Sequence, residues 1–403
     1  MEYAQTNQEM FLADWASTIR SSGLRDLIAL IMRPEVLSLA SGLPASELFP
    51  MSALAAAAAQ VFEGEPGMLQ YRPSSARLRE QIAQLMASQG VEADPEQIVI
   101  TTGAQQALDM LTRLFLNPGG QVMLEAASYT GVKQVVAPLM PEILPVPTDV
   151  HTGMDVDWVA RRLEEGARPA YIYAMARGHN PTGVTMSVDK RQQLVALARQ
   201  YNFPIIEDDA YGFLGYDKQV GVADTPLRAL DQEHVFYLGS FSKILVPSLR
   251  LGWIVTPKWL LPKLAVIKET CDLETSAFTQ SLVANYLDAN DMMGHIAHLQ
   301  DVYRERRDAM LNALKTHFPQ SARWSVPTHG LFIWVELPQT IDTTRLLEVA
   351  LAEEQVAFVP SGVFAVYDDD RGNPGINHCM RLNFSQVTPE RIEEGVRRIA
   401  KLL

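Results

Sequence analysis

The stretch Val235–Arg250 reads VFYLGSFSKILVPSLR, in which an apolar, strand-favouring run leads directly into a segment rich in polar groups. Runs of the same strand-favouring kind recur along the first 255 residues, at Ile98–Thr102, Gln121–Glu125, Ala170–Ala174, Pro204–Asp208 and Leu251–Val255. Stretches with helical periodicity, such as Gln105–Phe115 and Val188–Tyr201, lie between most of them. Strands that alternate with helices predict an α/β fold with a mostly parallel sheet covered on both faces.

The chain has 403 residues, more than one ordinary domain of about 100–200 residues. The alternation stops after about Asn290. A long charged helix toward His317 comes first, and shorter strands and helices follow at Leu331–Leu337, Thr343–Glu354, Val356–Pro360, Met380–Phe384 and from Pro389 onward. We therefore expect a second, smaller domain of α+β character, connected by the long helix.

The composition excludes several classes of protein. With 34 Lys and Arg against 47 Asp and Glu, the net charge is −13, which disfavours binding to nucleic acid or to an anionic membrane surface. Cys271 and Cys379 are too few and too far apart for a disulfide framework or a zinc site. The N-terminus has no secretory signal pattern, and the longest uncharged apolar run, Met51–Phe62, is shorter than the roughly 20 residues of a membrane span. A soluble, cytoplasmic protein is expected.

The segment Ser240–Lys243, with Arg250 soon after it, follows one of the predicted strands. Ligands of parallel sheets bind at the carboxyl ends of the strands, so chemistry is expected there. Two serines, a lysine and an arginine form a good anion pocket. The apolar neighbours of Lys243 favour its neutral amine, which is the form that attacks a carbonyl. The alternative is a solvated lysine at the start of a helix, with Arg250 in a surface ion pair.

The acidic segment Glu207–Tyr211 (EDDAY) also follows a predicted strand. Its carboxylates are plausible ligands for Mg²⁺. However, no P-loop of the G-x-x-x-x-G-K type occurs to supply a nucleotide. The alternative is that one buried carboxylate faces a cationic ring nitrogen, with Tyr211 reaching the same ligand.

Two glycine-containing turns stand after further strands. Gly178–Gly183 (GHNPTG) reads as a plain connection or as a rigid turn that directs Asn180 into a site. Thr101–Gln106 (TTGAQQ) places a glycine before a helix, where backbone N–H groups bind phosphate, although such turns are usually structural.

In this order and together, the four segments resemble the fold-type I pyridoxal 5′-phosphate (PLP) enzymes, in particular the class I aminotransferases and their 2-aminoadipate or multi-substrate subgroup. Pro34–Pro50, with its stretches Leu39–Pro44 and Leu48–Pro50, Leu69–Tyr71 and Arg381–Ser385 extend the resemblance over nearly the whole chain. It implies a large domain with a mostly parallel seven-stranded sheet flanked by helices, and a smaller α+β domain. The expected ranges are 1–48 for an N-terminal arm and part of the small domain, 49–290 for the large PLP-binding domain and 291–403 for the small C-terminal domain.

The resemblance implies roles around the cofactor ring. Lys243 carries PLP as a Schiff base and moves the proton during catalysis. Asp208, rather than Glu207 or Asp209, pairs with the pyridine nitrogen and keeps the ring an electron sink. The ring's remaining partners are expected to be Tyr211 and Asn180 at its phenolic oxygen and Tyr129 on its face.

The phosphate, by the same resemblance, is held by Ser240, Ser242 and Arg250 and by the turn of Gly103, Ala104 and Gln105. Tyr71 reaches the phosphate of a neighbouring subunit, which implies a homodimer with shared active sites. No metal is expected.

For the substrate, the resemblance implies that Arg381 grips the α-carboxylate, next to Asn180 and Gly42; without it, Arg381 reads as an arginine at a strand edge. Ser22 and Arg25 match positions of a mobile N-terminal helix that meets the substrate side chain. A solvated Arg25 is the alternative, with Arg72 or Arg77 supplying the charge.

The sequence departs from the family pattern in a few places. The loop Tyr71–Arg79 is short and lacks a glycine, Ser41-Gly42 replaces a glycine pair, and Arg177, Gly178 and His179 stand before Asn180 where other residues are usual. These departures are compatible with a specialised biosynthetic enzyme.

The function predicted is a PLP-dependent aminotransferase that moves an amino group between an L-amino acid and a 2-oxo acid by a ping-pong mechanism. Glutamate, 2-aminoadipate and aromatic or aliphatic amino acids are all candidate substrates. The alternatives are a PLP-dependent lyase, cyclase or oxidase. A non-catalytic regulator domain is a poorer reading, because the residues before Gly42 already match the enzyme's own N-terminal arm rather than a DNA-binding module.

Overall fold

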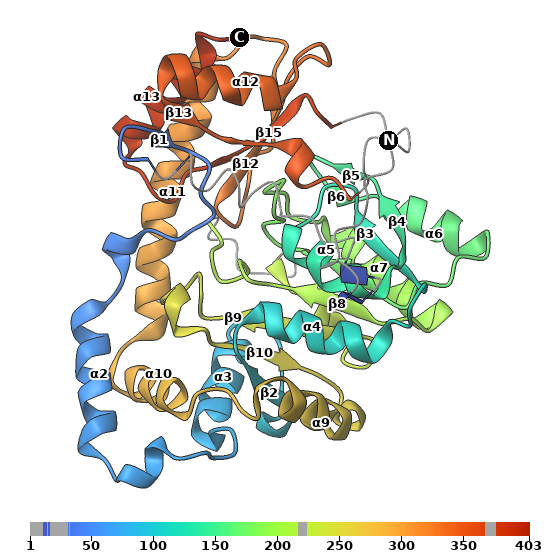
Figure 1. The fold of residues 1–403 in the computed structure, drawn as a ribbon, viewed down its shortest axis with the longest axis vertical. Coiled ribbons are helices and arrows are strands. Elements are labelled where there is room, and N and C mark those ends of the chain that lie inside the picture. The colour runs from blue at the N-terminus through green and yellow to red at the C-terminus, as the bar shows by residue number, and fades with distance from the viewer. Residues whose placement is uncertain (1–10, 14, 17–30, 32, 217–223, 367–375) are drawn as a thin grey trace.

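A central sheet of seven strands organises the larger part of the molecule (Figure 1). The computed structural model describes residues 11–13, 15–16, 31, 33–216, 224–366 and 376–403. The strands lie in the order β2-β10-β9-β8-β7-β3-β4. Their bounds are β2 Ile98–Thr101, β3 Gln121–Glu125, β4 Glu142–Val146, β7 Ile172–Ala174, β8 Ile205–Asp208, β9 Val235–Ser240 and β10 Gly252–Val255.

The pairing within this sheet is parallel except at β10, which runs antiparallel to both β2 and β9. The inner strands β7, β8 and β9 are buried along their whole length, as expected for strands covered on both faces. Their carboxyl ends therefore meet at one edge of the sheet, and the loops that follow them lie close together.

Helices cover the sheet on both sides, with α4 in front of it in the view of Figure 1. Side-chain caps explain several of their starts: Ser187 accepts from the backbone of Lys190, and Ser75 from that of Leu78. The helices between residues 51 and 289 are α2 Met51–Glu63, α3 Ala76–Ala87, α4 Ala104–Phe115, α5 Thr130–Val136, α6 Val156–Glu164, α7 Val188–Tyr201, α8 Leu227–Leu230, α9 Leu261–Asp272 and α10 Ala277–Ala289.

A second, antiparallel sheet of four strands lies at the other end of the long helix α11, Met292–His317 (Figure 1). Its order is β11-β12-β15-β14, with bounds Arg323–Trp324, Phe332–Glu336, Cys379–Asn383 and Val359–Pro360. Helices α12, Thr343–Val349, and α13, Pro389–Ala400, complete this region. Two short pairs stand apart: β1 Leu37–Ser38 with β13 Val356–Ala357, and β5 Thr148–Asp149 with β6 Gly153–Met154.

The α/β fold with a mostly parallel seven-stranded sheet is confirmed, and the predicted strands and helices match the observed ones to within a few residues. One prediction needs correction: Val356–Pro360 is not one strand, because its two halves pair in different sheets. The N-terminal segment pairs with the C-terminal region through β1 and β13, while the three domain ranges stay a prediction. In the part of the chain that is described, no helix is long and apolar enough to cross a membrane.

Candidate active site

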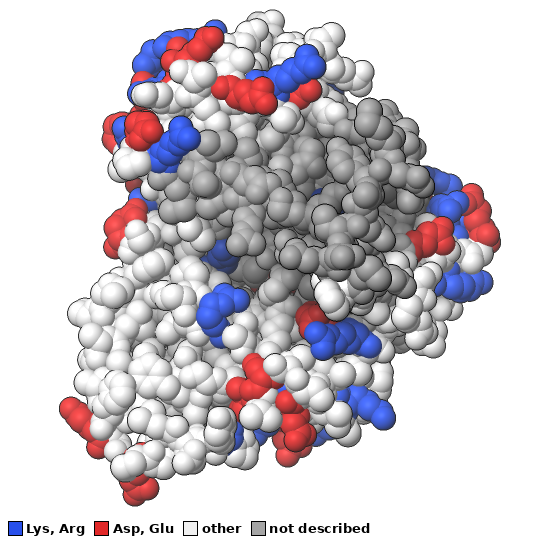
Figure 2. Space-filling view, viewed as in Figure 1, with Lys and Arg blue, Asp and Glu red and all other residues white. Residues whose placement is uncertain are grey.

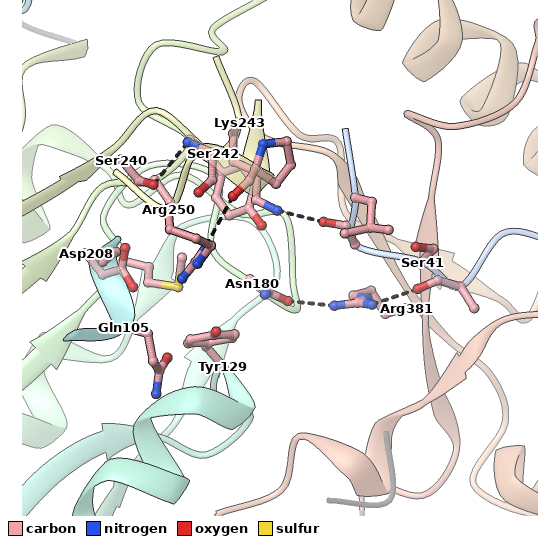
Figure 3. A pocket seen from close by; sticks show the side chains of 18 of the residues that line it. Ser41, Gln105, Tyr129, Asn180, Asp208, Ser240, Ser242, Lys243, Arg250 and Arg381 are labelled. Atoms are coloured by element: carbon pink, nitrogen blue, oxygen red, sulfur yellow. Dashed lines mark hydrogen bonds between the residues drawn. The ribbon is translucent and has the colours of Figure 1, made fainter. Parts of the chain in front are cut away.

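A cavity of about 390 Å³ opens between the carboxyl ends of the central strands and the four-stranded sheet (Figure 3). Residues after β7, β8 and β9 form one wall, and Arg381 on β15 enters from the other side. The N-terminal residues Ala40–Leu43 complete it. The cavity thus collects the segments that the sequence singled out, although they are far apart in the chain.

Lys243 lies in the turn after β9, and its Nζ donates to the carbonyl oxygen of Gly42 at 2.9 Å. Burial, together with the positive charges of Arg381 and Arg250, lowers the pKa of Lys243 to about 8. An amine with this pKa is partly neutral near physiological pH, so it can attack a carbonyl group.

The anion-binding end of the cavity is built around Arg250 and the start of α4. Gly103 precedes α4 with φ of +84°, and a Cβ there would lie 2.8 Å from Nη2 of Arg250, so the close approach requires glycine. Ala104 and Gln105 line the cavity beside Ser240, the last residue of β9, and Ser242, which follows it. Helix N-terminal N–H groups, hydroxyls and a guanidinium fit a phosphate group.

Asp208 is the carboxylate that faces the cavity from the end of β8. Its Oδ2 accepts a hydrogen bond of 2.8 Å from the Tyr173 hydroxyl, whereas its buried Oδ1 has no partner among the described residues. Burial raises its pKa to about 6, and the hydrogen bond from Tyr173 opposes this. A buried oxygen left without a donor fits the protonated ring nitrogen of PLP.

The neighbouring carboxylates point elsewhere. Glu207 accepts from the backbone N–H groups of Leu227 and Arg228 at 2.7 and 2.8 Å, and Asp209 pairs with the buried Arg177. The three consecutive carboxylates therefore do not form a joint ligand set for Mg²⁺. In the described segments, no group of three or more His, Cys, Asp or Glu side chains is placed to hold a metal ion.

Arg381 and Asn180 form the opposite wall. Nη1 of Arg381 donates to Oδ1 of Asn180 at 2.9 Å, and Nη2 donates to the Ala40 carbonyl at 2.8 Å. The guanidinium lies over the rings of Phe332 and Phe364, and no described carboxylate pairs with it. Burial lowers the pKa of Arg381 to about 10. This buried cation is suited to a ligand carboxylate, and Asn180 keeps its amide N–H groups for a ligand.

Two tyrosines frame the space between these walls. Tyr211 is buried, packs edge-on against Phe332 at 5.6 Å between ring centroids, and lies with its own ring centroid 6.0 Å from Nζ of Lys243. Tyr129 stands at the start of α5, where Gly131 leaves the room that its ring occupies. Burial and the charge of Asp208 raise the pKa of Tyr129. Both rings are placed to contact a planar ligand.

The structure brings together most of the site residues predicted from the sequence. Lining the cavity are Gly42, Ala104, Gln105, Tyr129, Asn180, Asp208, Tyr211, Ser240, Ser242, Lys243, Arg250 and Arg381. Gly103 lies behind Arg250. Tyr71 does not line the cavity and has 85% of its surface exposed, and Ser22 and Arg25 lie outside the described residues.

Sequence reasoning missed part of the apolar wall, formed by Ile31, Leu43 and Met175. The match of Leu39–Pro44 to the family was the available signal for Leu43. The residues that depart from the family pattern before Asn180 do not line the cavity: Arg177 pairs with Asp209, and His179 lies 3.0 Å from the Glu125 carboxylate. Arg77 is held by Asp288 on the surface of α10, away from this cavity.

Comparison with known proteins agrees with this geometry. Residues 34–399 match the family model "Aminotransferase class I and II". The chain is 36% identical to aromatic-amino-acid aminotransferase 1 of Thermococcus litoralis, over 100% of its own length and 96% of the relative. It is 38% identical to 2-aminoadipate transaminase of Thermus thermophilus, over 96% and 95%.

A solved structure of similar shape is the kynurenine aminotransferase of Pyrococcus horikoshii, crystallised with PMP. It has a TM-score of 0.90 and 36% identity over 98% of this chain and 97% of that one. The cavity, the fold and these similarities define a fold-type I PLP-dependent transferase. The chain belongs to the aminotransferase class I and II family, and the predicted resemblance, activity and cofactor are confirmed.

Proposed function

We propose that the protein transfers amino groups from neutral aromatic or aliphatic amino acids and from acidic ones to 2-oxo acids, with PLP held in the cavity around Lys243. The unpartnered Oδ1 of Asp208 carries this proposal, together with the anion cradle at Gly103 and Arg250. These groups are complementary to the two ends of PLP. When bound, PLP supplies an electron sink for the negative charge that develops at the substrate α-carbon.

Lys243 does the proton transfer. With its pKa lowered to about 8 by burial and by nearby arginines, Nζ accepts the proton of the substrate α-carbon and returns it as an acid. Its present bond to the Gly42 carbonyl holds the amine inside the cavity.

Arg381 orients the substrate. Two of its N–H groups are bonded to Asn180 and Ala40, and these bonds fix the plane of the guanidinium. The charge of Arg381, uncompensated by any described carboxylate, binds the α-carboxylate and so sets the direction of the bond that Lys243 breaks.

The breadth of substrates is inferred from the rest of the cavity wall. Its described cations are Lys243, Arg250 and Arg381, and each already has a role. Ile31 and Leu43 offer apolar surface for a neutral side chain. A distal carboxylate needs a further cation, for which Arg25 is the candidate. The names of the relatives, which act on aromatic amino acids and on 2-aminoadipate, support both substrate classes.

A homodimer is part of the proposal. Met51, Phe62, Leu69 and Tyr71 are exposed near one another in the chain, around α2. The surface over α2 and α10, at lower left in Figure 2, carries few charged side chains, as expected for a face that a second copy covers. Tyr71 would then complete the phosphate site of the partner. The net charge of −13 and the absence of a disulfide between Cys271 and Cys379 support a cytoplasmic location.

The test is a half-reaction screen. The PLP-loaded protein is mixed with single amino acids, and the change of cofactor absorbance that accompanies amino-group transfer is followed. Phenylalanine, leucine and glutamate are expected to react, whereas Lys243→Ala is not. Products of elimination or oxidation in place of a 2-oxo acid would contradict the proposal.

A further inference from the structure

Tyr173 lies directly behind Asp208, outside the residues that line the cavity. It is on β7, paired with Ile206 of β8. Because side chains alternate along a strand, Tyr173, Ile206 and Asp208 share one face of the sheet. The hydroxyl of Tyr173 reaches Oδ2 of Asp208 at 2.8 Å, and Tyr173 is 1% exposed.

The hydrogen bond runs in one direction only. Burial and the negative charge of Asp208 raise the pKa of Tyr173 well above its ordinary value, so the phenol keeps its proton and donates it. A donated hydrogen bond stabilises the anionic form of Asp208, against the burial that raises its pKa. It also fixes the plane of the carboxylate, and Oδ1 is then the oxygen left without a partner.

We infer that Tyr173 is a positioning residue for the cofactor's ring nitrogen: its hydroxyl keeps Asp208 charged and turned so that Oδ1 meets that nitrogen. This inference rests on the proposed cofactor site. It predicts that the Tyr173 hydroxyl matters only when the ring nitrogen is present.

Tyr171 provides a matched control. It is two residues earlier, immediately before β7, and is 0% exposed, with its own pKa raised by burial. Its hydroxyl is bonded to Oγ1 of Thr112 at 3.0 Å, away from Asp208. Tyr171→Phe and Tyr173→Phe therefore remove hydroxyls from two fully buried tyrosines two positions apart in the chain, and only the second change touches the carboxylate.

The experiment measures equilibrium binding of two cofactors to the cofactor-free wild type and to both variants. The first is PLP and the second is 1-deaza-PLP, in which a carbon replaces the ring nitrogen. The phosphate and the aldehyde are the same in both, so binding through Arg250 and Lys243 is preserved. Thermal unfolding of the cofactor-free variants establishes that they fold.

For Tyr173→Phe, the dissociation constant for PLP is expected to rise about 10-fold, in line with the loss of a hydrogen bond to a charged group. The constant for 1-deaza-PLP is expected to stay within about twofold, since that cofactor makes no pair with Asp208. Tyr171→Phe is expected to change neither.

Equal weakening of both cofactors by Tyr173→Phe would assign the hydroxyl to general packing and overturn the inference. No weakening of either would overturn it as well. A wild type that bound neither cofactor would instead contradict the proposed cofactor site itself.

Discussion

Asp208 and Asp209 are consecutive and both are buried, but their carboxylates have different hydrogen-bond partners. Asp208 shares a sheet face with Tyr173 and keeps one oxygen without a partner at the cavity. Asp209 accepts from Arg177 and from the Tyr237 hydroxyl at 2.8 Å, so its charge is compensated on the side away from the cavity. A buried carboxylate with an oxygen that lacks a hydrogen-bond partner indicates a ligand site. A buried carboxylate whose oxygens are all paired belongs to the internal structure of the fold.

The largest effect is expected for Asp208, the carboxylate with an unpartnered oxygen. Asp208→Ala removes the partner of the ring nitrogen, and turnover should fall by several orders of magnitude because the electron sink is lost. Since Asp208 has an unsatisfied oxygen and a pKa raised by burial, its removal should change the unfolding free energy little. Steady-state kinetics measure the turnover, and urea unfolding measures the free energy of unfolding. Near-normal turnover of Asp208→Ala would contradict the role given to Asp208.

Asp209→Ala should show the reverse pattern. It leaves the guanidinium of Arg177 buried without its partner, which should cost about 3–5 kcal/mol of unfolding free energy. Turnover of the folded fraction should fall much less than in Asp208→Ala. The double variant Arg177→Met with Asp209→Leu should recover much of the stability, because it removes both charges. Equal losses of turnover from the two alanine variants would contradict the distinction.

The same contrast separates two arginines. Arg77 is already paired with Asp288, whereas Arg25 is proposed to meet a distal substrate carboxylate. Arg25→Ala should lower the preference for glutamate or 2-aminoadipate over neutral amino acids by about 10–150-fold, because a charge-assisted hydrogen bond typically contributes that much to binding. Arg77→Ala, the matched control, should leave this ratio unchanged. Specificity profiles of both variants decide it, and an unchanged ratio in Arg25→Ala removes that residue from the site.

The smallest expected effect is a shift in a pH profile. Because burial and nearby cations lower the pKa of Lys243 to about 8, its neutral fraction grows as pH rises through that value. The rate at which cofactor-free protein binds PLP covalently should rise likewise and level off above about pH 8. Arg381→Ala removes a repelling charge and should move the midpoint upward. A wild-type midpoint near the ordinary pKa of lysine, about 10.4, would contradict this cause.

Much of the fold was predictable because β7 and most of β9 are continuous apolar runs, and β8 begins with one, between helical stretches. Strand β4 gave a weaker signal, since it is an edge strand that contains Pro145. The split of Val356–Pro360 between two sheets depends on tertiary pairing, which a local pattern does not carry.

The cofactor residues were predictable because they follow strand ends in short motifs. The hydrogen-bond partners of the two aspartates were not predictable, because they are distant in the sequence: Tyr173 is 35 positions from Asp208, and Arg177 is 32 positions from Asp209. Without those contacts, the choice of Asp208 over Asp209 rested on its spacing to Tyr211 and on its position at the strand end, within the family resemblance. The departure at Arg177, one of those compatible with a specialised biosynthetic enzyme, is explained by its ion pair with Asp209.

The central claim is that Lys243 carries the cofactor, and borohydride reduction tests it most directly. Reduction of the PLP-loaded wild type should fix the cofactor covalently to the peptide that contains Lys243, as found by mass spectrometry after digestion. Lys243→Ala should fold, with an unchanged far-ultraviolet circular dichroism spectrum, and should release all of its cofactor after the same treatment. Cofactor still fixed to Lys243→Ala, or fixed in the wild type to a different lysine, would contradict the account.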